Sequence, residues 1–319
     1  MSSSRSFSSR YVIRGVQGLI GAVVLWFAWH TLSTQWSVVR GQLNSIHAEW
    51  RWIVLSGAIF LTTYGVLIET WRQMLGAWRS ALTFWTAARI WSISNLGRYV
   101  PGKVWQIGAM AVMAERQKVS GIAATGSAVL NTVVNLATGF VVVAALGWQL
   151  FDLPFAGGKR AAIVLLLLAT IGLAILPRAL PWLLRTIERL SGRKFNVGPL
   201  PASAIGIAIT GNLIAWVLYG IAFAVFARGI IGDTHGSLMG YIAVYALSYL
   251  VGYLVLLAPA GVGVREASMI ALLPAARLAD PGQAAVLAVT SRLWLTALEV
   301  APGAIFLGLD GVRRRPTER

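Results

Sequence analysis

The residues best suited to chemistry in this chain lie in two short segments that combine fixed charge with helix-breaking residues. The first segment places Arg98 and Lys103 on either side of a Pro-Gly pair, with Tyr99 and Trp105 in the same element. Proline removes a backbone donor and glycine allows a tight turn, so a helix is expected to break here. The amides freed at the start of the next helix, together with its dipole, favour an anion. Arginine as a planar fork and lysine as a point charge would suit a phosphate.

The second segment places Arg265 and Glu266 after two closely spaced glycines. Adjacent opposite charges cannot face the same way on a helix, so each is expected to find another partner. Arg292 and Glu299 are seven residues apart, share one helix face and are candidate partners. For Glu266, Arg292 and Glu299, a structural role as buried ion pairs and a functional role remain equally open. The glycine-rich setting of Arg265 favours a functional role.

The elements that carry these segments are apolar enough to lie in a bilayer. The chain is 57% hydrophobic and 12% charged, and runs such as 202–227 match a hydrocarbon core of about 30 Å. We therefore predict an all-α, polytopic membrane bundle with about eight spans and two broken, re-entrant helical pairs, at about 81–118 and 238–275. One transmembrane domain is expected at 14–310, between an N-terminal tail (1–13) and a basic C-terminal tail (311–319). Helical pieces are expected at 14–32, 52–71, 81–98, 104–114, 121–150, 160–176, 202–226, 238–257, 264–273 and 283–309.

The net charge of +16 is interpreted as a topology signal rather than as a nucleic-acid surface. If the helical pieces alternate in direction from a cytoplasmic N-terminus, most loop lysines and arginines fall on the inner side. This predicts a multi-pass protein of the bacterial cytoplasmic membrane with both termini cytoplasmic. The two broken pairs would enter from opposite faces and meet near the midplane, as in some transporters. The alternative for Arg98 and Lys103 is that they extend to the outer interface and contact headgroups without specificity.

The sequence lacks the residues that several kinds of chemistry require. There is no cysteine, the 3 histidines lack metal-ligand spacing, and the 11 acidic residues form no carboxylate cluster. We therefore expect no metal, no cofactor, no enzymatic activity and no ATP-driven pump. Asn131 and Asn135 lie on one helix face, where hydrogen bonding between helices is favoured over a polar path.

The two breaks together resemble the lysylphosphatidylglycerol synthase transmembrane, or flippase-like, family. The resemblance lies in GRYVPGKVW at 97–105, PAGVGVREA at 259–267, and the later SRL at 291–293 with Glu299. It covers about residues 15–310. The resemblance implies a flippase-like membrane domain. The sequence ends at Arg319 without the aminoacyl-transfer domain of the synthases, so we do not expect synthase activity. Many members of the family that this chain resembles have an acidic residue near the position of Asn131. Because an asparagine stands here, a proton-coupling role at that helix is not expected.

The favoured hypothesis is a flippase or transporter for a phospholipid or a polyprenyl-phosphate-linked glycolipid. The alternative is a non-transporting accessory subunit that binds such a lipid beside a glycosyltransferase or another pathway enzyme. A membrane-embedded transferase is a third hypothesis. The expected substrate-binding residues are Arg98, Tyr99, Lys103, Trp105, Arg265, Glu266, Arg292 and Glu299.

Overall fold

The structure is a computed structural model of the 319-residue chain, and in its described part all regular secondary structure is helical. The predicted first span at 14–32 and both terminal tails lie wholly or almost wholly outside the described residues. Described are residues 48–78, 80–99, 104–148, 150, 160, 163–164, 166–175, 182, 202–232, 234, 236–254, 261 and 263–313.

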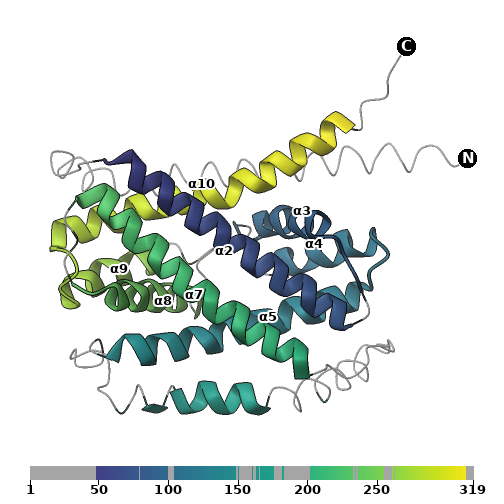
Figure 1. Cartoon of the computed structure of the whole chain (residues 1–319), viewed down its shortest axis with the longest axis horizontal. Helices are drawn as coiled ribbons and strands as arrows, with labels where there is room; N and C mark the ends of the chain where they lie inside the picture. Colours follow the sequence, from purple (N-terminus) through teal and green to yellow (C-terminus); the bar gives the residue numbers. More distant parts are fainter. Residues whose placement is uncertain are drawn as a thin grey trace, which may run out of the picture.

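Four of the described helices are long and apolar enough to cross a membrane, judged by length and composition. They are α2 (Trp50–Ala77), α5 (Gly121–Leu146), α7 (Ala202–Ile231) and α10 (Pro281–Arg313). α2 and α7 run antiparallel along each other (Figure 1), and the amide of Glu49 donates to the carbonyl of Gly229 at 2.9 Å where they meet. The prediction of a multi-pass helical membrane protein is therefore confirmed, while the count of about eight spans stays a prediction.

The other labelled helices are shorter, and they flank the two predicted breaks. The first break lies between α3 (Phe84–Asn95) and α4 (Val104–Glu115), with a short 3₁₀ turn, η2 (Leu96–Tyr99), at its start. The second lies between α8 (Leu238–Leu254) and α9 (Val264–Ala275). α3, α4 and α9 have 12 residues each, so each is about 18 Å long, well short of a hydrocarbon core.

Local sequence explains where these elements start. Gly261 and Gly263 have φ angles of +73° and +77°, a conformation open to glycine, and α9 starts directly after them. α10 starts two residues before the predicted boundary because Asp280 and Gln283 cap it reciprocally. The Gln283 amide donates to Asp280 Oδ1 at 2.8 Å, and the Asp280 amide donates to Gln283 Oε1 at 3.1 Å.

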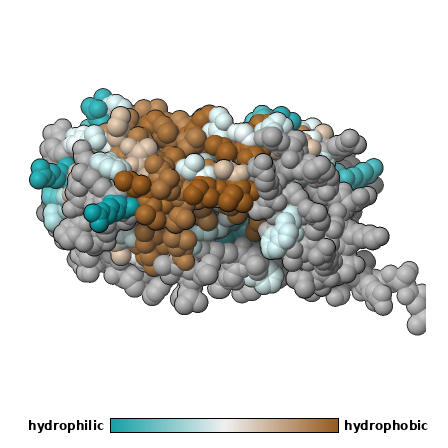
Figure 2. All heavy atoms as spheres, turned by 90° about the horizontal axis from the view of Figure 1, so that it is seen from below, coloured by the Kyte–Doolittle hydropathy of each residue, from teal (hydrophilic) through white to brown (hydrophobic). Residues whose placement is uncertain are grey.

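The outer surface carries the apolar side chains that a lipid environment requires. In Figure 2 hydrophobic residues cover the middle of the visible face, and hydrophilic residues gather mainly toward its two ends. Large apolar side chains that are exposed include Val54, Leu61, Val133 and Ile214. An exposed apolar surface of this extent is typical of contact with lipid or with another protein.

Candidate functional site

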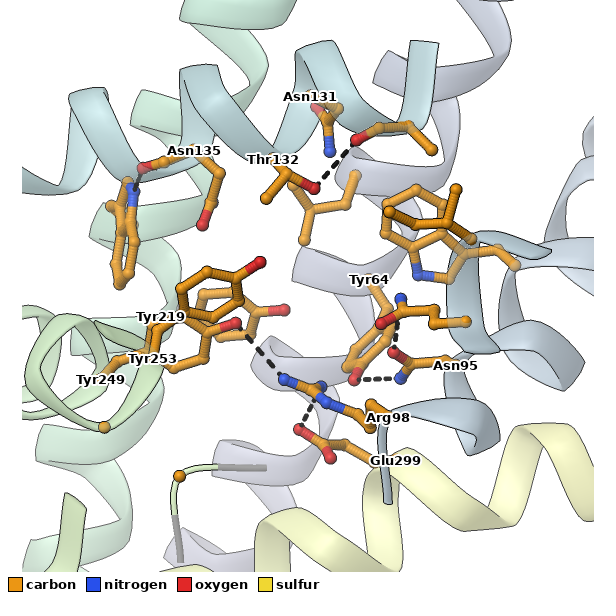
Figure 3. A pocket seen from close by; sticks show the side chains of 18 of the residues that line it. Tyr64, Asn95, Arg98, Asn131, Thr132, Asn135, Tyr219, Tyr249, Tyr253 and Glu299 are labelled. Atoms are coloured by element: carbon orange, nitrogen blue, oxygen red, sulfur yellow. Dashed lines mark hydrogen bonds and ion pairs between the residues drawn. The ribbon is translucent and has the colours of Figure 1, made fainter. Parts of the chain in front are cut away.

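The two helix breaks meet at one cavity inside the bundle. The cavity has a volume of about 160 Å³ and is lined by Arg98 from the first break, by Gly261 and Arg265 from the second, and by Glu299 from α10. Helices α2, α3, α4, α5, α7 and α8 complete the wall (Figure 3). Residues that are more than 160 positions apart in sequence are thus brought to one polar chamber.

Arg98 is held in place by hydrogen bonds on both sides of its guanidinium. Its Nη1 donates to Glu299 Oε1 at 3.0 Å, and its Nη2 donates to the Tyr249 hydroxyl at 3.3 Å. The Tyr99 hydroxyl donates to the second carboxylate oxygen of Glu299 at 2.5 Å. Arg98 therefore reaches the cavity as a fixed cation whose charge is already balanced by a carboxylate.

Arg265 is a second buried cation at the cavity, in a different environment. The residue is 6% exposed, and its guanidinium carbon lies 4.8 Å from the ring centroid of Tyr245 and 5.8 Å from that of Tyr249. Its Nη2 is buried and has no hydrogen-bond partner among the described residues. A buried donor without a partner is uncommon, so this arginine is suited to an anion that enters the cavity.

Two glycines allow the end of α8 and the start of α9 to pack closely beside Arg265. A Cβ on Gly252 of α8 would lie 3.0 Å from the Cβ of Arg265, and one on Gly261 would lie 2.8 Å from the carbonyl oxygen of Gly252. The start of α9 therefore packs directly on the end of α8, which brings Arg265 against the tyrosine faces.

Glu266 and Arg292 form a separate buried ion pair, with 3.5 Å between Arg292 Nε and Glu266 Oε1. Neither residue is among those that line the cavity. A partner for the second break on the last helix was predicted, and Arg292 is that partner for Glu266. Glu299 pairs instead with Arg98 of the first break. The geometry favours the structural role for Glu266 and Arg292, since their pairing links α9 to α10.

The remaining predicted residues occupy different positions. Lys103 lies outside the described residues. Trp105 is 58% exposed and does not line the cavity, whereas its neighbour Gln106 does. Tyr99 is buried and acts on Glu299 rather than on the cavity wall.

A cluster of tyrosines on the cavity wall was not predicted from the sequence. Tyr219 stacks on Tyr245 with 5.8 Å between ring centroids, and Tyr249 stacks on Tyr253 at 6.2 Å. A signal was available, because α8 carries tyrosines at 241, 245, 249 and 253, a four-residue spacing that aligns them on one helix face. The tyrosines lining the cavity are Tyr64, Tyr219, Tyr245, Tyr249 and Tyr253.

Amide side chains of α5 form the side of the cavity opposite Arg98 and Glu299 (Figure 3). Asn135 Nδ2 donates to Asn212 Oδ1 at 2.9 Å, and Asn212 Nδ2 donates to Asn131 Oδ1 at 2.9 Å. These bonds confirm the predicted interhelical role of Asn131 and Asn135, which link α5 to α7. Both residues also line the cavity, so they serve as packing contacts and as polar wall.

A second amide network lies beside Arg98. Gln106 Nε2 donates to Asn95 Oδ1 at 3.1 Å, and Asn95 Nδ2 donates to the Tyr64 hydroxyl at 3.0 Å. This network links both helices of the first break to α2. The whole arrangement offers two cations, one carboxylate, aromatic faces and neutral amides, which is a set able to bind a polar group that carries negative charge.

The chemistry of the described residues does not point to a metal centre, since no three histidine, cysteine, aspartate or glutamate side chains gather within this part of the chain. Comparison with curated proteins finds no match. The family model described as the lysylphosphatidylglycerol synthase TM region matches residues 16–303, which include both breaks and every residue of the cavity wall. The chain therefore belongs to the lysylphosphatidylglycerol synthase TM family.

Proposed function

We propose that this chain is a lipid transporter that binds a phosphate-bearing headgroup in the cavity and moves it across the bacterial cytoplasmic membrane. One observation carries the proposal. Arg98 and Arg265, from two separate helix breaks, line the same cavity within an apolar helical bundle. Membership of a lipid-related membrane family supports a lipid as the ligand.

The physical problem for such a transporter is the phosphate. An ionised group is very costly to place in hydrocarbon, so a site that moves it must replace its water and balance its charge. Arg265 offers an unused donor, and Arg98 offers a guanidinium whose bond to Glu299 can be exchanged for a phosphate oxygen. The acyl or prenyl tails would stay in the surrounding lipid while the headgroup occupies the cavity.

We propose further that the two short helix pairs are opposed re-entrant hairpins within a bundle of about eight spans, with both termini cytoplasmic. The start of α8 and the end of α9 lie together, since the Tyr241 hydroxyl donates to the Leu278 carbonyl at 2.8 Å. The connections from α2 to α3 and from α4 to α5 lie at the other end of the bundle (Figure 1). The two breaks would then approach the cavity from opposite sides of the membrane.

Reconstitution of the purified protein in liposomes with headgroup-labelled lipids tests the proposal. We expect headgroups to become accessible on the opposite leaflet faster than in protein-free vesicles. Arg98→Gln and Arg265→Gln should each lower the rate about tenfold or more, because each removes a charged hydrogen bond to the phosphate. Arg116→Gln, at an exposed arginine in the turn after α4, is the matched control and should leave the rate unchanged.

The outcomes separate the hypotheses. No acceleration across a broad lipid panel would refute transport, and tight lipid binding without transport would support the accessory subunit beside a glycosyltransferase or other pathway enzyme. Transport that persists in both arginine variants would refute the site. Formation of a new lipid product by the purified protein would refute the proposal that the chain is not an enzyme.

A further inference from the structure

We infer that the cavity selects lipids whose headgroup joins a single phosphodiester to an uncharged polyhydroxyl group. It should discriminate against cationic headgroups and against diphosphates. The inference rests on the site of the proposed function and specifies its substrate class. It follows from the charge, the free hydrogen-bonding atoms and the size of the cavity.

The charge of the cavity wall favours a monoanionic ligand. Among the described lining residues, Arg98, Arg265 and Glu299 are charged. Arg98 and Glu299 balance each other at 3.0 Å, so Arg265 gives the described part of the wall a net charge of plus one. The ion pair between Glu266 and Arg292 behind the wall does not alter this balance. Because an uncompensated charge is costly away from water, a monoanion is the ligand that leaves the fewest charges unbalanced.

A cationic headgroup meets a specific obstacle in this cavity. Tyrosine faces bind ammonium groups in many sites. Here the guanidinium of Arg265 already lies over the rings of Tyr245 and Tyr249, at 4.8 and 5.8 Å. An ammonium group placed at these rings would therefore lie beside another cation. The same aromatic wall that elsewhere favours cations disfavours them here.

The side of the cavity opposite Arg98 carries unused hydrogen-bonding atoms of two amide side chains. The Oδ1 of Asn131 and the Nδ2 of Asn135 are held by Asn212. The Nδ2 of Asn131 and the Oδ1 of Asn135 take part in none of the hydrogen bonds between described residues, and both side chains line the cavity (Figure 3). A fixed neutral donor beside a fixed neutral acceptor suits hydroxyl groups, because each hydroxyl both donates and accepts.

The cavity is larger than a phosphate group. A volume of about 160 Å³ holds on the order of ten water molecules, which is more than one phosphate needs. The amides of α5 and the guanidinium of Arg98 lie on opposite sides of this space (Figure 3). A phosphate bound at Arg98 therefore leaves room for its attached polyol on the side of Asn131 and Asn135.

Two lipid classes share this chemistry, and native mass spectrometry of the full-length protein in lipid nanodiscs distinguishes them. The panel contains phosphatidylglycerol, phosphatidylinositol and a hexosyl polyprenyl monophosphate as candidate ligands. Phosphatidylcholine, lysylphosphatidylglycerol and a polyprenyl diphosphate are the comparison lipids. We expect at least one candidate to bind about tenfold more tightly than every comparison lipid. Which candidate binds identifies the source as a glycerophospholipid or a prenyl-linked sugar.

Asn131→Asp tests the charge argument, because it replaces an amide by a carboxylate of nearly equal size and cancels the net positive charge. We expect the candidate lipids to bind this variant about tenfold more weakly than they bind the native chain. The affinity for lysylphosphatidylglycerol should rise relative to that for the candidate lipids. Arg116→Gln is the control for a charge change outside the cavity, and thermal unfolding of each variant checks the fold. The inference would be overturned if the native chain bound cationic lipids as tightly as the candidate lipids, or more tightly. It would also be overturned if a folded Asn131→Asp protein kept the lipid preference of the native chain. Selective binding without transport would instead contradict only the proposed function, and equally fast transport of cationic lipids would contradict only the inference.

Discussion

Two arginines of the cavity are chemically identical and yet differ in what surrounds them. Arg98 is fixed by a carboxylate and a tyrosine hydroxyl, whereas Arg265 rests on two aromatic rings with one donor unused. The first arrangement keeps a buried cation stable when the cavity is empty. The second leaves binding capacity for a ligand. Glu299 therefore determines how much of the positive charge of the cavity is available.

The pairing of Arg98 with Glu299 gives a prediction on stability. Glu299→Gln leaves Arg98 without its carboxylate in a largely buried position, so we expect the free energy of unfolding to fall by about 3 kcal/mol or more. The double variant Arg98→Gln, Glu299→Gln should lose less than the sum of the two single losses, because it leaves no unpaired charge. Denaturant unfolding in detergent, followed by tryptophan fluorescence, measures this cycle.

The chain offers a matched control for this cycle in the ion pair between Arg51 and Glu49, whose side chains are 74% and 40% exposed. Glu49→Gln should cost less than about 1 kcal/mol, since surface pairs contribute little. Strict additivity of the two cavity substitutions would show that Arg98 and Glu299 are not coupled.

At the scale of elements, the second break depends on the contact between Gly252 and Gly261. We predict that Gly261→Ala destabilises the protein by about 1–3 kcal/mol, because its φ of +73° disfavours a side chain and the new Cβ would lie 2.8 Å from the Gly252 carbonyl. Lipid transport should fall with it, since Arg265 is positioned by this contact. Thermal unfolding and the liposome assay measure the two effects.

Gly65→Ala in α2 is the control, since a Cβ there meets nothing within 4 Å. We expect this helical substitution to be neutral or slightly stabilising, because alanine has the higher helix propensity. If both glycine variants behave alike, the second break does not require the backbone conformation seen at Gly261.

Sequence patterns located the breaks but not the pairing across them. Proline and glycine act on neighbouring backbone, so the starts of α4 and α9 were predicted correctly from local residues. The predicted helix ends at 98 and 257 lie three residues beyond the observed ends of α3 and α8. The choice of Glu299 as the partner of Arg98, 201 residues away, depends on how the helices pack, and no spacing encodes it. The tyrosines of α8 were overlooked although their spacing is local, because aromatic residues in an apolar helix are usually packing residues.

At the scale of the molecule, the described helices place polar connections at two opposite ends, with the cavity between them. The start of α2 and the end of α7 meet at one end. At the other end Trp78, after α2, approaches α5, where a Cβ on Gly126 would lie 3.4 Å from its ring. This arrangement fits a bundle whose long helices cross the membrane and whose two breaks meet inside it.

The membrane orientation can be tested directly because the chain has no cysteine, so single-cysteine variants need no altered background. Arg116→Cys lies in the turn after α4 and Thr234→Cys lies between α7 and α8, at opposite ends of the bundle, and both positions are exposed (Figure 1). Since the loop charges predict that the first is cytoplasmic, an impermeant maleimide should label Thr234→Cys in intact spheroplasts. It should label Arg116→Cys only after permeabilisation. The reverse labelling pattern would show that the predicted orientation is inverted. Labelling of both cysteines from the same side would contradict a bundle that spans the membrane between these two ends. It would also contradict the approach of the two breaks from opposite faces of the membrane.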